Sequence, residues 1–217
     1  DANILDVKTD QLKTMSRDKF LSKIAEVKNK TLGKLVVKEY PTGSGSAAHF
    51  KALCKELKQK KKFDPDIIFV DYINICASSR YKSMGGVNSY SYIKAIAEEL
   101  RGLAMELDTC MMTGTQINRD GSKSNDPGME STSDSFGLPM SLDFFFAAVA
   151  DQVMIDNSQQ LFIPLKTRWG NKSKLKSQLI GVNFDKMRYY DLDSSASTVE
   201  AAKETSMKER LKKKSTD

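Results

Sequence analysis

Ile67-Ile68-Phe69-Val70-Asp71-Tyr72 is a run of four large apolar residues that ends in a carboxylate. A short, β-prone run of this kind, entered from Pro65-Asp66, predicts a strand buried on both faces, as in the centre of a parallel sheet. Open α/β sheets bind ligands in the crevice at the carboxyl ends of their strands. An Asp there can hold Mg²⁺ through its water shell beside the phosphates of a nucleotide, which is the Walker B arrangement. The pattern alone equally allows Asp71 to cap the following turn.

A second strand with a polar end follows in the sequence. Ser89 to Leu107 carries an apolar stripe at helical spacing, and Cys110 to Gln116 is an apolar strand that ends in an amide side chain. The order strand, helix, strand predicts a right-handed crossover between parallel strands. Asp71 and Gln116 are therefore predicted to end neighbouring strands at the same sheet edge. A carboxylate for a metal and an amide able to sense a γ-phosphate are typical of a nucleoside triphosphate site.

The composition narrows the class of protein. The 217 residues, of which 40% are hydrophobic and 29% charged, suit one globular α/β domain or two small ones. The net charge of +6 allows a polyanionic partner without requiring one. A single histidine and the absence of a CxxC pair exclude a multi-histidine or zinc-ribbon metal site. The three separated cysteines are typical of reduced core residues, and no apolar run approaches membrane-spanning length, so a cytoplasmic protein with no membrane partner is expected.

The other elements are predicted from the same periodicities. They are an amphipathic helix over Ser16 to Lys30, a strand over Gly33 to Tyr40, a helix with apolar positions from Phe50 to Leu57, a core strand over Phe144 to Val149, a strand over Leu161 to Trp169, and a closing hairpin over 178–183 and 187–192. The loop Gly43 to His49 lacks the Gly-Lys-Ser/Thr ending of a phosphate loop, so a linker and helix N-cap are predicted there. The long polar loop 117–135 is equally compatible with a functional loop and a surface insertion.

The order of these features resembles the C-terminal RecA-like motor domain of DnaB-type hexameric replicative DNA helicases, most closely the replicative helicases of T-even-like bacteriophages. The resemblance runs from Asn3 to about Asp193. Its anchors are the Phe69-Val70-Asp71-Tyr72 strand end, the Ile93 to Leu107 helix, Thr115-Gln116-Ile117-Asn118-Arg119 and Lys166-Thr167-Arg168-Trp169-Gly170. Each motif is short, and their specificity lies in the shared order and spacing. The implied fold is α/β, a RecA-like mostly parallel sheet flanked by helices, with a C-terminal β-hairpin.

The resemblance implies ATP and Mg²⁺ as cofactors and assigns roles to four residues. Asp71 is similar to the Walker B carboxylate that orders the water ligands of Mg²⁺, and Gln116 to the residue that links the γ-phosphate to the DNA-facing loop. Lys166 and Arg168 are similar to the basic pair that reaches into the ATP site of the neighbouring subunit, where an arginine stabilises charge on the transferred phosphoryl group. Because the pair alternates along a strand, a solvent-facing pair without this role is the alternative.

The resemblance also implies partners. Single-stranded DNA would thread through a hexameric ring, held at its phosphates by basic side chains in the loops after the two strands. The candidates for DNA contacts are Arg80, Lys82, Arg119 and Lys123. A primase and a helicase loader are further expected partners, and host cytoplasm is the expected location if the chain is of phage origin.

One departure from the family pattern affects the expected activity. No Gly-x-x-x-x-Gly-Lys-Ser/Thr loop occurs in the sequence, so the P-loop strand and helix are expected to be missing and the chain to be inactive alone. We expect residues 1–193 to be part of a helicase motor domain and residues 194–217 to be a charged, disordered or frayed tail. A RecA-type strand-exchange ATPase and a non-catalytic module that binds DNA or a partner are the alternative functions.

Overall fold

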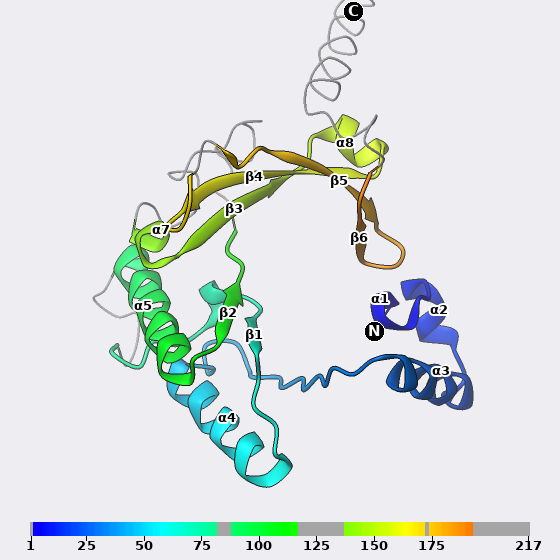
Figure 1. Ribbon diagram of the computed structural model, residues 1–217, viewed down its shortest axis with the longest axis horizontal. Coiled ribbons are helices and arrows are strands. Elements are labelled where there is room, and N and C mark those ends of the chain that lie inside the picture. The colour runs from blue at the N-terminus through cyan, green and yellow to red at the C-terminus, as the bar shows by residue number, and fades with distance from the viewer. Residues whose placement is uncertain (1, 82–87, 117–136, 172–173, 193–217) are drawn as a thin grey trace, which may run out of the picture. The chain divides into compact units, whose positions relative to one another are not determined.

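The computed structural model describes residues 2–81, 88–116, 137–171 and 174–192 (Figure 1). The chain divides into two compact units, one made of Asp1–Val37, Phe146–Pro164 and Ser173–Asp217, and the other of Lys38–Phe145 and Leu165–Lys172. The expected tail, residues 194–217, lies outside the described residues. Among the helices of the described ranges, none is both long enough and apolar enough to cross a bilayer.

The second unit is built on a strand, helix, strand arrangement. Strands β1 (Ile67–Val70) and β2 (Cys110–Thr113) pair in parallel, with Ile67 opposite Cys110 and Val70 opposite Thr113. Helix α5 (Ser89–Leu107) connects them, as the order of the sequence predicts. The side chain of Asn88 caps the helix by accepting a hydrogen bond from the backbone of Ser91 at 2.8 Å, and the helix ends at Asp108 in the left-handed conformation.

Helix α5 carries the core of this unit. Three short or flanking helices complete the unit: α4 (Ala47–Lys61), the 3-10 helix η1 (Ile73–Ile75) and α7 (Gly137–Ser141). Helix α5 packs against α4, η1, α7 and β2. The apolar stripe predicted from the sequence lies on the buried face of α5. Ile96 of this helix and Ile73 of η1 are the most completely buried large side chains among the described residues. The buried residues of the core cluster are Val70, Ile73, Cys76, Tyr92, Ile93, Ile96, Ala97, Leu100 and Leu138.

Strand β1 is buried on one face only. Ile68 and Val70 pack toward the core around α5, whereas Ile67 is 47% exposed and Phe69 is 70% exposed. On β2, Met112 pairs with Phe69 and is also exposed. The prediction that β1 is buried on both faces is therefore wrong, because the apolar residues alternate between a covered and an uncovered face of the two-stranded sheet.

The first unit joins N-terminal helices to an antiparallel sheet. Its helices are α1 (Ala2–Leu5), α2 (Thr9–Thr14), α3 (Arg17–Lys30) and α8 (Gln152–Asp156). Its sheet has the order β3 (Phe144–Val149), β4 (Gln159–Thr167), β5 (Gln178–Asn183), β6 (Arg188–Tyr190). Residues 144–145 of β3 and 165–167 of β4 belong to the second unit. Strand β5 pairs antiparallel with both β4 and β6, which confirms the predicted closing hairpin.

Polar contacts join the N-terminal segment to the turn between β5 and β6. Asp6 lies 2.9 Å from Lys186 and 3.1 Å from Arg188, and the backbone of Thr9 donates to the carbonyl of Asp185 at 2.8 Å. The hydrogen bond from Lys186, together with the charge of Lys186, lowers the pKa of Asp6. These contacts fix the start of the chain on the hairpin.

The predicted strand over Gly33 to Tyr40 is absent. The structure describes these residues, and they form neither helix nor strand, with Leu35 and Val37 exposed. A β-prone sequence needs a neighbouring strand to complete its hydrogen bonds, and no described strand pairs with this segment. The other predicted helices and strands are present, so the α/β class is confirmed.

Candidate functional site

The carboxyl ends of β1 and β2 lie level with each other. Val70 and Thr113 are register partners, and the Thr113 hydroxyl donates to the Val70 carbonyl at 2.8 Å. Asp71 follows β1 directly, is exposed, and precedes a cis peptide bond to Tyr72. Gln116 follows β2 after Gly114 and Thr115. The structure therefore places both predicted residues at the same edge of the parallel pair.

The segments that leave the two strands are bonded to each other. The backbone of Ile73 donates to the carbonyl of Gly114 at 3.2 Å, and the Thr115 hydroxyl donates to Oδ1 of Asn74 at 2.8 Å. These two hydrogen bonds hold the segment after β2 against the segment after β1.

The glycine-serine loop is bonded to η1 and to the residues that follow it. The backbone of Gly43 donates to the carbonyl of Ile75 at 2.8 Å, and the backbone of Ala77 donates to Gly45 at 2.7 Å. Ser46 is the N-cap residue of α4, but its hydroxyl pairs with Nδ1 of His49 at 2.9 Å and does not cap the helix. The loop thus has the linker role predicted for it.

Glu99 on α5 organises the loop after η1. Its carboxylate accepts hydrogen bonds from the Ser78 hydroxyl at 2.6 Å, the Ser79 backbone at 2.8 Å and the Arg80 backbone at 3.2 Å. Partial burial raises the pKa of Glu99, but these hydrogen bonds outweigh burial and the net pKa is lowered. The neighbouring Glu98 forms an ion pair with the Arg80 guanidinium at 2.5 Å. The sequence pattern predicts that both glutamates lie on the polar face of the helix, but it does not predict which residues they contact.

Glu99→Gln should destabilise the chain at neutral pH. A group whose pKa is depressed by folding contributes stability above its unfolded pKa, about 4.3 for Glu, and loses it as pH falls through the folded value. The variant should cost about 1 kcal/mol at pH 7, and its difference from wild type should shrink as the pH falls below about 4.3. Urea unfolding at several pH values measures this. Glu106→Gln, which changes an exposed residue paired with Lys51, is the control; a pH-independent Glu99→Gln difference would contradict the prediction.

Lys166 and Arg168 both contact the segment that contains α7. The Lys166 ammonium donates to the carbonyl of Pro139 at 2.6 Å, and Nη2 of Arg168 donates to the carbonyl of Met140 at 3.2 Å. Burial and the nearby Arg168 charge lower the pKa of Lys166, against the opposing effect of Asp143. A freely solvated pair would lack these contacts.

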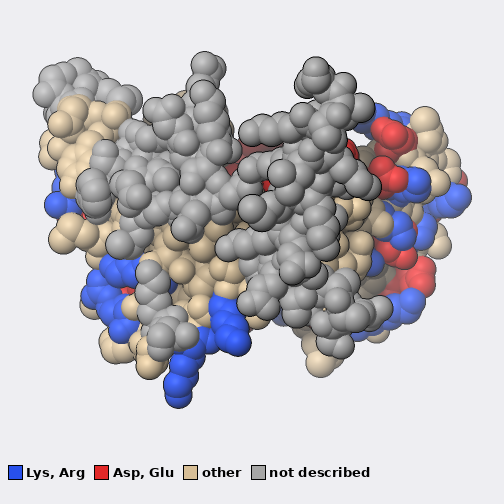
Figure 2. Space-filling view, turned by 90° about the horizontal axis from the view of Figure 1, so that it is seen from above, with Lys and Arg blue, Asp and Glu red and all other residues tan. Residues whose placement is uncertain are grey.

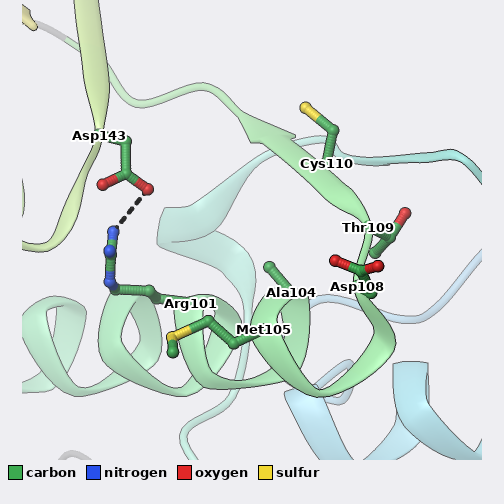
Figure 3. Close-up of a pocket in the computed structure, with 7 residues that line it drawn as sticks. All are labelled: Arg101, Ala104, Met105, Asp108, Thr109, Cys110 and Asp143. Carbon is green, nitrogen blue, oxygen red and sulfur yellow. Dashed lines mark hydrogen bonds and ion pairs between the residues drawn. The ribbon is translucent and has the colours of Figure 1, made fainter. Parts of the chain in front are cut away.

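Sequence reasoning did not identify Asp143 and Arg101 as part of this cluster. Nε of Arg168 lies 3.0 Å from Oδ1 of Asp143, and the Arg101 guanidinium donates to Oδ2 of Asp143 at 2.7 Å. Figure 3 shows Arg101 on α5 pointing toward Asp143 across one side of an open pocket of about 380 Å³. The one available signal was a charged residue directly before the apolar run Phe144 to Val149.

The predicted DNA contacts are described only in part. Lys82, Arg119 and Lys123 lie outside the described residues, and Arg80 forms an ion pair with Glu98. On the face shown in Figure 2, basic and acidic side chains are interspersed in one part of the visible described surface, whereas mainly basic side chains are visible in another. Within the described ranges, no group of three or more His, Cys, Asp or Glu side chains is arranged to hold a metal. The exposed carboxylate of Asp71 suits a metal held through water.

The strand, helix, strand order and the polar residues at the two strand ends lie within a segment that matches a known protein family. Residues 2–176 match the family described as DnaB-like helicase C terminal domain. The chain belongs to this family.

A DnaB-like relative extends this result. The chain is 38% identical over 203 residues to the DnaB-like replicative helicase of Enterobacteria phage T4, covering 92% of this chain and 42% of that protein. It thus spans less than half the length of that relative.

Two solved structures share the fold. The structure of a DnaB-like replicative helicase, studied with its interactions with primase, matches with a TM-score of 0.69 and 17% identity, covering 88% of this chain and 46% of that one. A second structure, described as an ATPase domain, matches with a TM-score of 0.68 and 16% identity, covering 88% of this chain and 68% of that one. The predicted RecA-like fold and the resemblance to DnaB-type helicases are confirmed.

Proposed function

We propose that this chain forms part of an ATP-driven replicative DNA helicase that translocates on single-stranded DNA. The observation that carries the proposal is the pairing of β1 with β2, which brings Asp71 and Gln116 to one edge in a chain of the DnaB-like family. No phosphate loop occurs in the 217 residues, so the proposal requires a polypeptide outside them that supplies it. We call this chain together with that polypeptide the complete helicase.

Each proposed role follows from the chemistry of the side chain. Asp71 would order the water ligands of Mg²⁺, and the metal would offset charge on the β- and γ-phosphates of ATP. Gln116 would sense the γ-phosphate, and its position beside the Thr115–Asn74 contact would pass the change to the segment after β1. Arg168, with Lys166, would act on the ATP of the neighbouring subunit, which requires a ring or filament with a heterologous interface.

The proposed partners follow from the same motor. Single-stranded DNA would pass through a ring, expected to be a hexamer, with Arg80, Lys82, Arg119 and Lys123 as candidate contacts to its phosphates. The structural relative solved for its interactions with primase supports a primase as a partner. A helicase loader is a further proposed partner, and the proposed location is the host cytoplasm. Residues 1–193 are proposed to form the part of the motor domain in this chain.

Asp71→Asn tests the proposal. The variant should lower Mg²⁺-dependent, DNA-stimulated ATP hydrolysis by the complete helicase about 10–100-fold, because the amide removes the charge that orders the metal's water ligands. Asp66→Asn, at the amino end of the same strand, is the matched control and should retain wild-type rates. The measurement is the hydrolysis rate as a function of Mg²⁺ concentration.

The isolated 217-residue chain provides the second arm. We expect it to show no Mg²⁺-dependent hydrolysis, since it lacks a phosphate cradle. Turnover by the isolated chain would contradict the need for an outside phosphate loop. The chain can also be mixed with a polypeptide that supplies a phosphate loop. If the mixture still hydrolysed no ATP while the chain bound DNA, the chain would be a non-catalytic DNA-binding module and not part of a motor.

A further inference from the structure

Asp143 lies between two guanidinium groups from distant parts of the sequence. Arg101 comes from α5, and Arg168 follows β4. The Asp143 carboxylate is 2.7 Å from Arg101 and 3.0 Å from Arg168, and all three residues belong to the second unit. The hydrogen bond from Arg101, together with the charges of Arg101, Arg168 and Lys166, outweighs burial and lowers the pKa of Asp143. The carboxylate is therefore ionised at neutral pH, which allows it to hold both cations.

The two arginines are held in different ways. Arg101 donates hydrogen bonds both to Oδ2 of Asp143 and to the carbonyl of Ser141, at 2.7 and 3.1 Å. Oδ1 of Asp143 is buried and accepts no hydrogen bond within the described part of the chain, although Nε of Arg168 lies 3.0 Å away. Arg101 thus fixes the carboxylate with one directed hydrogen bond, whereas charge attraction alone draws the Arg168 side chain to it.

The backbone of Arg168 is fixed at the same point. Its amide donates to the carbonyl of Asp143 at 2.7 Å, and its Nη2 donates to the carbonyl of Met140 at 3.2 Å. The Arg168 side chain remains 41% exposed. Arg168 is therefore anchored at its backbone and on one side of its guanidinium, and an exposed part remains for a further contact.

We infer that Asp143 is a positioning residue for Arg168 and that Arg101 holds Asp143 in place for this task. The inference rests on the proposed role of Arg168 toward the ATP of a neighbouring subunit. An arginine that stabilises a transferring phosphoryl group must be held in the productive geometry before the reaction, because a displacement of about 1 Å can cost on the order of 100-fold in rate. Asp143 provides this by holding the Arg168 guanidinium near its own carboxylate through charge attraction, while the guanidinium stays partly exposed.

The test is Asp143→Asn in the complete helicase. The variant keeps the shape of the side chain and removes its charge, so kcat for DNA-stimulated ATP hydrolysis should fall about 10–100-fold with KM for ATP unchanged. Asp108→Asn is the matched control, because Asp108 lines the same pocket, and Asn tolerates its left-handed backbone. The control should hydrolyse ATP at the wild-type rate.

The double variant separates positioning from a general loss of structure. If Asp143 acts through Arg168, then Asp143→Asn in an Arg168→Ala background should cause no further loss of kcat. Arg101→Lys keeps the charge but loses the guanidinium that donates to both Asp143 and the Ser141 carbonyl. It should also reduce kcat, which keeps the inference testable if Asp143→Asn fails to assemble. A further loss in the double variant, or wild-type kcat in Asp143→Asn or Arg101→Lys, would overturn the inference.

Two outcomes separate the positioning role of Asp143 from the proposed role of Arg168. A large loss in Arg168→Ala combined with full activity in Asp143→Asn would reject the positioning role alone. Full activity in Arg168→Ala would reject the role of Arg168 and the inference with it.

Discussion

Arg168→Ala is expected to lower DNA-stimulated ATP hydrolysis by the complete helicase about 10³–10⁵-fold, the range for removing an arginine that acts in trans on a phosphoryl group. ATP binding should be largely retained, because this arginine acts on charge that develops in the transition state. Single-turnover hydrolysis and nucleotide binding, measured on the same preparation, separate the two effects. Lys176→Ala, an exposed basic residue after the same strand, is the control.

A mixing experiment tests whether Arg168 acts in trans. Asp71→Asn subunits lack the metal-site carboxylate but keep Arg168, and Arg168→Ala subunits have the opposite defect. In equal random mixtures, about one in four interfaces joins an intact Asp71 to an intact Arg168 from its neighbour. Hydrolysis should therefore recover to well above that of either variant alone. Absence of recovery, in rings shown to contain both variants, would mean that the two residues serve the same subunit's site.

Ile96→Ala is expected to be the most destabilising substitution in the α5 core. The side chain is 1% exposed, and its truncation leaves a cavity among the buried residues around Ile73 and Ile93. The expected cost is about 2–5 kcal/mol in the free energy of unfolding. Denaturant unfolding of the 217-residue chain, followed by circular dichroism, measures this.

Phe69→Ala is the matched comparison for Ile96→Ala. Phe69 is a large apolar residue of the same unit, but it is 70% exposed on the uncovered face of β1, so its truncation should cost about 0.5 kcal/mol or less. The alternation of exposed and covered residues along β1 predicts that this face is uncovered in solution. A cost similar to that of Ile96→Ala would contradict this prediction.

Much of the fold was predictable because local patterns encode it. The apolar stripe of α5 at helical spacing specified a helix and its buried face, and the strand, helix, strand order implied a parallel pair. Parallel pairing then placed Asp71 and Gln116 at one edge, since the carboxyl ends of parallel strands meet there. The sequence around Lys166 and Arg168 likewise marks the basic pair as candidate site residues.

Contacts between distant residues could not be predicted in this way. The segment Gly33 to Tyr40 has strand-like residues but no partner strand among the described elements, and β1 has four apolar residues but only one covered face. Both outcomes depend on which other elements pack nearby, and periodicity carries no information about that. The role of Glu99 likewise depends on a distant loop to which it bonds.

The Arg101, Asp143 and Arg168 cluster shows the same limit at the candidate site. Each side chain alone is compatible with an ordinary surface charge, and their spacing in sequence gives no sign of contact. The sequence alone determined the α5 helix, the parallel crossover and the edge that holds Asp71 and Gln116, because these follow from local periodicity and chain order. The pairing of β3 with β4, which brings the residue before β3 next to the residue after β4, decided that Asp143 lies 3.0 Å from Arg168, because an ion pair between distant segments exists only after the chain has folded.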